Sequence, residues 1–281
     1  MIVKDKNIIL QSKHGRPFLA DVYYENDGLQ KPVVIFSHGY RGFKDWGPFD
    51  LIAEKFAEIG FIYVKFNFSH NGTTIVHPVD FMDLDAFGND NISIELDDLG
   101  VVIDWVCSKD FPVIESELNR EEIYLIGHSR GGGIAILKAR EDKRVKRLCT
   151  WASLNEVSKY WTAEQLEQIK RDGVIFLPNS RTGQMMPIKW QMYENYYANL
   201  DRLYIPDAVK QLQIPFLIIH GTQDETVPVA AAIEMELWNK NAELFLVENG
   251  NHNFGAKHPW PYENLPPDSE KVVRETIRFF S

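Results

Sequence analysis

Ser129, Asp224 and His252 are three residues whose types and order suit nucleophilic catalysis. A serine hydroxyl is a weak nucleophile at neutral pH, so it needs a base to accept its proton and donors to stabilise an oxyanion. Histidine can act as the base, and a carboxylate can orient its imidazole and stabilise the imidazolium. Serine, acid and histidine follow one of the chain orders known for such triads. The sequence therefore predicts that Ser129 is a nucleophile activated by His252 and Asp224.

Ser129 lies in the pentapeptide Gly127-His128-Ser129-Arg130-Gly131, which follows an apolar stretch and precedes a helical one. A nucleophile at such a strand–turn–helix junction sits on a tight turn that requires small neighbouring residues. Gly127 and Gly131 meet that requirement. The alternative is a glycine-rich turn of a phosphate site, but the lysine of a P-loop and the spacing of a dinucleotide fingerprint are both missing.

Asp224 and His252 each lie a few residues beyond an apolar stretch, in the loop that would follow a strand. Glu225 is the neighbouring alternative to Asp224 as the acid, and a solvated turn carboxylate is the non-catalytic interpretation. His258 is the nearby alternative to His252, but its proline-rich surroundings indicate a surface loop. We therefore favour Asp224 as the acid and His252 as the base.

Backbone N–H groups are expected to stabilise the oxyanion. One comes from Arg130, which follows the nucleophile, and the other from Tyr40, in the loop after an early apolar stretch. His38 in the same loop is assigned a structural role. Arg41 and Lys44, also in this loop, carry two hypotheses: attraction of a substrate carboxylate, or solvated loop charges.

Alternating strands and helices have to position these residues. Short apolar stretches are typical of strands that are covered on both faces. Amphipathic spacing of apolar residues is typical of helices. The predicted strands are 7–10, 19–24, 32–36, 61–66, 122–126, 145–151, 214–219 and 242–247, and the predicted helices are 49–59, 92–106, 134–140, 229–238 and 270–280. The first two strands form an antiparallel hairpin, and 69–89 is expected to be a loop. The alternation predicts an α/β fold with a mostly parallel central sheet, helices on both faces and ligands beyond the carboxyl ends of the strands.

The segment from about 155 to 210 interrupts this alternation and is rich in aromatic residues. A structureless loop of that length is implausible in a compact domain. We interpret the segment as a partly helical cap inserted into a single domain spanning 1–281. Trp161 and Trp190 are candidate substrate contacts, and packing within the cap is the alternative.

Composition excludes some classes of function. The net charge of −10 argues against a protein that binds a nucleic-acid backbone. No stretch approaches the length of a membrane span and no secretory signal is evident, so we expect a cytoplasmic protein with no membrane partner. Cys107 and Cys149 are expected to be buried, inert thiols, since no spacing suggests zinc. We expect no metal and no cofactor, and the oligomeric state is left open.

Four local patterns together resemble the α/β hydrolases: His38-Gly39, the elbow around Ser129, Gly221-x-x-Asp224-x-x-Val227-Pro228, and Asn251-His252. Within that superfamily the chain is similar to the cinnamoyl/feruloyl esterase and dienelactone-hydrolase-like group. The resemblance implies the α/β-hydrolase fold with an oxyanion hole. Dienelactone hydrolases proper use cysteine as nucleophile, and this chain has Ser129.

The leading hypothesis is a serine hydrolase that cleaves carboxylic esters through an acyl-enzyme, with aromatic or short-chain acyl groups and a small-molecule substrate. A peptidase or amidase is the first alternative, since the same triad cleaves amides. A non-catalytic binding module is the second, because a fold does not fix a function.

Overall fold

The strands of the computed structural model carry apolar side chains that alternate between two buried layers. In β3 (Lys31–Ser37), Val33 and Ile35 belong to one layer, and Val34 and Phe36 belong to the other. Successive side chains of a strand point to opposite faces, so both faces of the sheet are covered. The structure describes residues 1–179 and 181–281.

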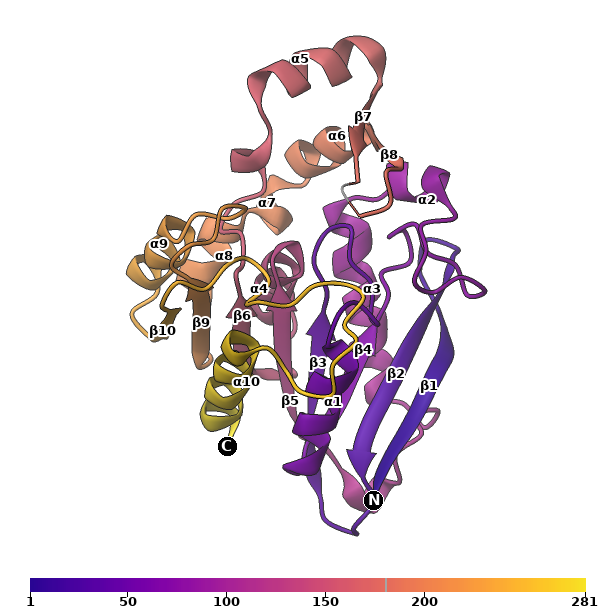
Figure 1. Cartoon of the computed structure of the whole chain (residues 1–281), viewed down its shortest axis with the longest axis vertical. Coiled ribbons are helices and arrows are strands. Elements are labelled where there is room, and N and C mark those ends of the chain that lie inside the picture. The colour runs from indigo at the N-terminus through magenta and orange to yellow at the C-terminus, as the bar shows by residue number, and fades with distance from the viewer. Residues whose placement is uncertain (180) are drawn as a thin grey trace.

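One eight-stranded sheet runs in the order β1-β2-β4-β3-β5-β6-β9-β10 (Figure 1). From β4 to β10 every neighbouring pair is parallel, whereas β2 is antiparallel to both β1 and β4. Besides β3, the strands are β1 (Ile2–Gln11), β2 (Pro17–Glu25), β4 (Ile62–Phe66), β5 (Leu118–His128), β6 (Val145–Trp151), β9 (Phe216–Gly221) and β10 (Ala242–Val247).

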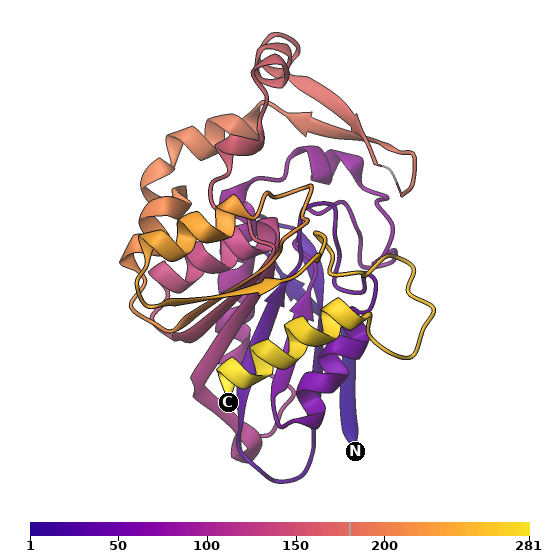
Figure 2. The same cartoon turned by 60° about the vertical axis from the view of Figure 1, so that its left-hand side comes forward.

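Helices cover both faces of this sheet (Figure 2). The layer containing Val33 is completed by α3 (Ile92–Val106), α4 (Arg130–Glu141), α8 (Ile205–Gln211) and α9 (Ala230–Trp238). The opposite layer is completed by α1 (Phe49–Glu58) and α10 (Pro267–Phe280). The predicted fold class, a mostly parallel sheet between two layers of helices, is confirmed.

Residues 155–210, here called the cap segment, join β6 to β9. Before α8 they form α5 (Ala163–Asp172), β7 (Val174–Pro178), β8 (Met185–Lys189), α6 (Gln191–Ala198) and α7 (Leu200–Leu203), with a 3-10 turn at Ser158–Tyr160. Figure 1 shows α5, β7 and β8 projecting beyond the end of the main sheet. The sequence does not predict the antiparallel β7–β8 hairpin, because both strands are short and largely lack an apolar alternation.

Several boundaries differ from the sequence prediction for identifiable reasons. The predicted 69–89 loop contains a short helix, α2 (Leu84–Gly88), whose first turn is capped by the Asp83 side chain. A 3-10 turn (Glu115–Glu117) precedes β5, which begins before the predicted strand. Helix α4 begins at Arg130 rather than 134, since three consecutive glycines hide its helical pattern.

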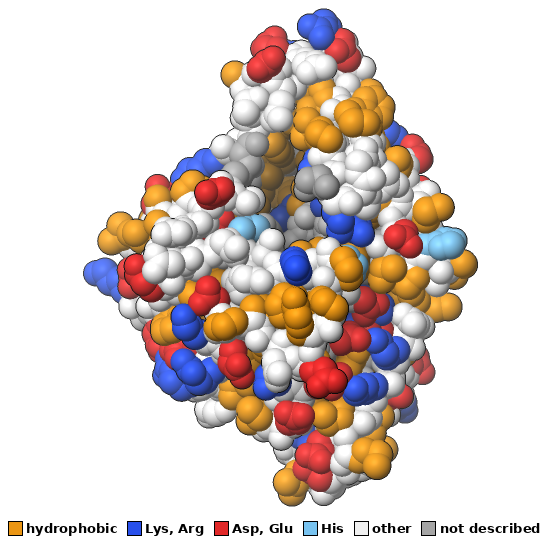
Figure 3. Space-filling model, viewed as in Figure 1, with side chains coloured by type: hydrophobic (Ala, Val, Ile, Leu, Met, Phe, Trp, Pro, Cys, Tyr) orange, Lys and Arg blue, Asp and Glu red, His pale blue; other side chains and the backbone are white. Residues whose placement is uncertain are grey.

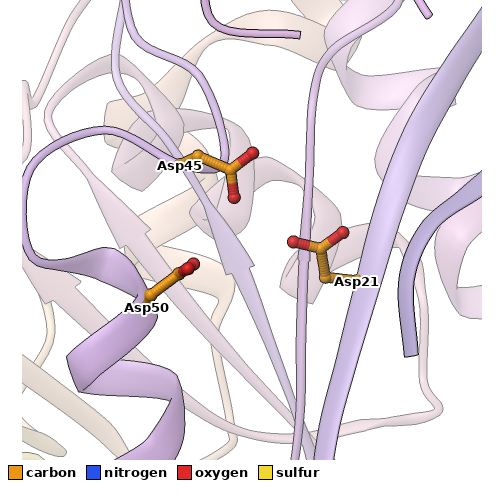
Figure 4. Close-up of side chains that lie close together, drawn as sticks. All are labelled: Asp21, Asp45 and Asp50. Carbon is orange, nitrogen blue, oxygen red and sulfur yellow. The ribbon is translucent and has the colours of Figure 1, made fainter. Parts of the chain in front are cut away.

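A buried ion-pair network ties β2, β4 and the loop after β3 together. The carboxylates of Asp21, Asp45 and Asp50 lie within 4.8 Å of one another (Figure 4). Lys44 Nζ is 2.8 Å from Asp21 and 2.7 Å from Asp45, and Lys65 Nζ is 2.9 Å from Asp21 and 2.6 Å from Asp50. Together with Lys6, whose Nζ is 2.7 Å from Asp50, the two lysines balance the charge of the three carboxylates. Because the buried Lys44 ammonium pairs with Asp21 and Asp45, the hypothesis that it attracts a substrate carboxylate is wrong.

Within 1–179 and 181–281, none of the helices combines the length and apolarity that crossing a bilayer demands.

The two cysteines differ in burial. Burial raises the pKa of the Cys149 thiol to about 12. Cys107 is only half-buried, so the expectation that both thiols are buried holds for Cys149 alone.

We expect Lys65→Met to lower the free energy of unfolding by about 3–5 kcal/mol, because it removes one of the two buried cations that face Asp21 and Asp45 and leaves the network with an uncompensated negative charge. Urea denaturation measures this loss. The matched control is Lys4→Met, which breaks the partly exposed pair with Glu54 and is expected to cost at most about 1 kcal/mol. Equal losses in the two variants would contradict the assignment of the network as a structural anchor.

Candidate active site

Ser129 is the single residue between the end of β5 and the start of α4. Its backbone has φ +54° and ψ −121°, a conformation that is strained for a residue with a side chain. The Ser129 N–H donates to the Trp151 carbonyl oxygen at 2.9 Å, which helps to hold this turn. The turn presents the hydroxyl beyond the carboxyl end of a central strand.

Two glycines allow the backbones around Ser129 to approach closely. A Cβ on Gly127 would overlap the Gly131 carbonyl oxygen, and a Cβ on Gly131 would overlap the Ser37 carbonyl oxygen at the end of β3. Gly39 also lies against the turn, because its Cβ would stand 3.1 Å from the Ser129 Cβ. The loop after β3 therefore adjoins Ser129 directly.

His252 connects Ser129 to Asp224. Its Nε2 lies 3.0 Å from Ser129 Oγ, and its Nδ1 lies 2.8 Å from Asp224 Oδ2. Since the carboxylate accepts the Nδ1 proton, Nε2 of the neutral ring is free to accept the serine proton. Asp224 follows β9 and His252 follows β10, which are parallel neighbours, so their loops meet at the same edge as Ser129.

The Asp224 carboxylate is buried but well supplied with hydrogen bonds. Its Oδ1 accepts the backbone N–H groups of Thr226 and Val227, each at 2.8 Å. Burial by itself raises the pKa of Asp224, but His220, His252 and the Val227 amide outweigh it and hold that pKa well below its usual range. The acid is therefore ionised at neutral pH. Glu225 is exposed instead.

The two residues predicted to form the oxyanion hole are joined through their side chains. The Arg130 guanidinium carbon lies 4.7 Å from the centre of the Tyr40 ring. Arg130 Nε donates to Glu95 at 2.8 Å and Nη2 to Asp90 at 3.1 Å, and all these groups are buried. Among described residues, no hydrogen bond is made by the backbone N–H of Tyr40 or Arg130. Both amides thus remain available as donors.

Three further histidines make hydrogen bonds around Ser129, Asp224 and His252; a structural role was predicted for His38, but not for His128 or His220. His38 Nδ1 donates to the Gly39 carbonyl oxygen at 2.9 Å while Nε2 accepts the Phe68 N–H, and burial lowers its pKa to about 4. His128 Nε2 donates to the His252 carbonyl oxygen at 2.9 Å. His220 Nε2 donates to the Val227 carbonyl oxygen at 2.8 Å and lies 3.3 Å from Asp224 Oδ2. His128 and His220 sit at strand ends beside the predicted triad, which was their only signal.

A cavity of about 460 Å³ opens beside Ser129 and His252. Figure 3 shows a hollow between the projecting cap segment and the end of the sheet, with lysine or arginine side chains beside it. Tyr40, Arg41 and His258 line the cavity. His258 makes no bond to Ser129; its Nδ1 accepts the Gly47 N–H at 2.9 Å.

Trp161 and Trp190 do not line this cavity among the described residues. Trp161 packs edge-on against Tyr193 with ring centres 4.0 Å apart, and Trp190 stacks on the same tyrosine at 5.5 Å. Both belong to a small apolar cluster within the cap segment. Their placement corrects the candidate role in substrate contact and favours packing.

We expect His128→Gln to flatten the dependence of stability on pH. Burial and the neighbouring His252 lower the pKa of His128 to about 3. Below pH 6.5 the unfolded chain protonates first, so the native state loses stability as pH falls toward 3. Between pH 7 and 5, urea unfolding is expected to show a loss smaller by about 1–2 kcal/mol in the variant. The exposed His77→Gln is the control, and parallel curves for wild type and His128→Gln would refute the argument.

Comparison with known proteins begins with sequence. No protein-family model matches the chain. An uncharacterized protein of Pseudomonas aeruginosa is 25% identical over 150 residues, which is 53% of this chain. The matched stretch covers only 36% of that relative's length.

Solved structures match the whole chain. Est1E from Butyrivibrio proteoclasticus has a TM-score of 0.67 at 19% identity and covers 98% of this chain and 99% of its own. A putative hydrolase from Agrobacterium vitis S4 scores 0.73 at 18% identity over 100% of both chains. The α/β hydrolase GrgF from a Penicillium species scores 0.67 at 17% identity, over 100% of this chain and 98% of its own. These likenesses confirm the predicted fold.

Proposed function

We propose that this chain, which has the α/β-hydrolase fold, hydrolyses carboxylic esters through an acyl-enzyme on Ser129. The observation that carries the proposal is the continuous chain of hydrogen bonds from Ser129 Oγ through His252 to Asp224. The Ser129 end of this series of hydrogen bonds lies at the cavity, where an ester carbonyl can reach the hydroxyl. No metal or cofactor enters the proposed reaction.

In the first half of the reaction, Ser129 Oγ attacks the acyl carbon while its proton passes to His252 Nε2. The carbonyl π electrons move to oxygen, and the Tyr40 and Arg130 amides donate to that oxyanion. When the tetrahedral intermediate collapses, the bond to the alcohol oxygen breaks and His252 gives its proton to the leaving alcohol. Water then repeats the sequence on the acyl-enzyme and regenerates Ser129.

Asp224 serves the reaction through its charge. His252 becomes positive in each transition state, and the ionised, buried carboxylate 2.8 Å from its Nδ1 stabilises that charge. The two backbone N–H donors fix the carboxylate in place, so little reorganisation accompanies proton transfer.

The comparisons support an ester as substrate by analogy. One solved structure is Est1E with bound ferulic acid, at 21% identity and a TM-score of 0.68. We infer that aromatic or short-chain acyl esters are suitable first substrates for this chain. Amide hydrolysis is an outcome of the tests below.

Ser129→Ala is expected to lower turnover of short p-nitrophenyl esters by about 10³-fold or more, since the nucleophile is lost. A fluorophosphonate probe is expected to label folded wild type but neither heat-denatured protein nor the variant. Ser108→Ala, in the turn just after α3, is the control and is expected to keep wild-type activity. Near-wild-type turnover by Ser129→Ala would sink the proposal, absence of labelling would favour a binding module, and faster cleavage of matched anilides would favour an amidase.

Asp224→Asn is expected to lower kcat by about 10³–10⁴-fold, because the amide cannot stabilise the imidazolium and favours the wrong tautomer. Steady-state kinetics on the same esters measures the loss. The adjacent Glu225→Gln makes the same change of charge on an exposed side chain and is expected to have little effect. A larger loss for Glu225→Gln than for Asp224→Asn would transfer the acid role to Glu225.

A further inference from the structure

The cavity beside Ser129 is lined by cations and, among the described residues, by no carboxylate. Its charged lining side chains are Arg41, Arg181 and Lys257. This contrasts with a chain that carries 40 acidic and 30 basic residues and a net charge of −10. A concave surface of one sign concentrates ligands of the opposite sign.

Arg41 reaches the cavity from the loop that carries the proposed oxyanion donor Tyr40. Its Nη1 donates to the Pro178 carbonyl oxygen at 3.3 Å, which links this loop to the end of β7. Its Nε is buried without a hydrogen-bond partner among the described residues. Among the described residues no carboxylate pairs with Arg41, so most of its N–H donors remain available to a ligand.

Arg181 reaches the same cavity from the turn between β7 and β8. Its guanidinium carbon lies 5.3 Å from the Phe43 ring centre and 5.4 Å from that of Phe81. Contact with aromatic rings helps to hold a guanidinium in place and leaves its N–H groups free to donate to a ligand. Like Arg41, it has no ion-pair partner within residues 1–179 and 181–281.

Asn179 supplies a neutral donor in the same turn. Its side chain lines the cavity, is 6% exposed, and has an Nδ2 without a partner among the described residues. Its Oδ1 is fixed by accepting the Arg181 backbone N–H at 3.0 Å. A buried donor without a partner is destabilising, and a ligand oxygen would supply the missing acceptor.

We propose that Arg41, Arg181 and Asn179 form a subsite for an anionic group, so that the substrate is an ester bearing a second, ionised carboxylate. Two planar guanidinium groups and an amide suit the two oxygens of a carboxylate, and Lys257 adds a longer-range attraction. The inference rests on the proposed function of Ser129. Asn179 and Arg181 belong to the cap segment, whereas Arg41 belongs to the loop after β3. A carboxylate bound by all three would therefore connect the cap segment to that loop.

Two pairs of esters of matched shape test the subsite. Monomethyl terephthalate against methyl 4-carbamoylbenzoate places the charge on the acyl side, and 4-acetoxybenzoate against 4-acetoxybenzamide places it on the alcohol side. In wild type we expect kcat/KM for the charged member of at least one pair to exceed that of the neutral member by about tenfold or more. The ratio within one enzyme is independent of how much protein is folded.

Arg181→Met is expected to reduce that ratio by about tenfold, mainly through KM, and Arg41→Met to reduce it likewise. Lys240→Met removes a charge from an exposed residue far from the cavity and keeps the wild-type ratio. A wild-type ratio near one in both pairs, or a ratio unchanged in both arginine variants, would overturn the subsite while ester turnover upheld Ser129.

Binding tests the subsite without turnover. Isothermal titration of Ser129→Ala with terephthalate and with the neutral terephthalamide is expected to show tighter binding of the dianion, lost in the added Arg181→Met background. Equal affinities for the two compounds would reject the subsite. This result stands even if no ester is hydrolysed, so failure of the subsite and failure of the proposed function are distinguishable.

Discussion

The strained backbone of Ser129 is the constraint on which the site depends. A positive φ at a non-glycine residue is costly, and it persists only where the surroundings over-determine it. Here the end of β5, the first turn of α4 and the end of β3 approach so closely that Gly127 and Gly131 have no room for a Cβ. The same close approach aims the hydroxyl at His252 and brings the loop of Tyr40 against it.

The parallel sheet then determines which groups meet Ser129. Asp224 and His252 are 28 residues apart in the chain, but they follow adjacent strands and arrive with hydrogen-bonding geometry. The surroundings of each titratable side chain near these residues determine whether it is charged or neutral. Asp224 is kept ionised by its donors, whereas burial keeps His38 and His128 neutral. Those neutral histidines can therefore fix backbone carbonyl groups without adding charge next to the imidazolium that the proposed reaction requires.

The sequence was sufficient where a residue's position follows from local periodicity. Strand 145–151 and helix 92–106 have clear patterns, and the candidates Ser129, Asp224 and His252 all follow recognisable strands. The sequence was insufficient where tertiary contacts decide which way a side chain points. Nothing local shows that Lys44 turns into the Asp21 network while Arg41 faces the cavity, or that Trp161 packs on Tyr193. The contribution of Asn179 and Arg181 depends on the β7–β8 hairpin, whose short strands lack the alternation that would reveal them.

The central claim is that Ser129 carries the acyl group during ester hydrolysis, and trapping that intermediate tests it most directly. Wild-type protein would be mixed briefly with p-nitrophenyl acetate, quenched in acid, digested and mapped by mass spectrometry. If Ser129 is the nucleophile, one acetyl group is found on the peptide containing Ser129 and is absent from protein denatured before mixing. Continued ester turnover with the acetyl group on another residue, or with no covalent intermediate under conditions where deacylation is slowed, would contradict it.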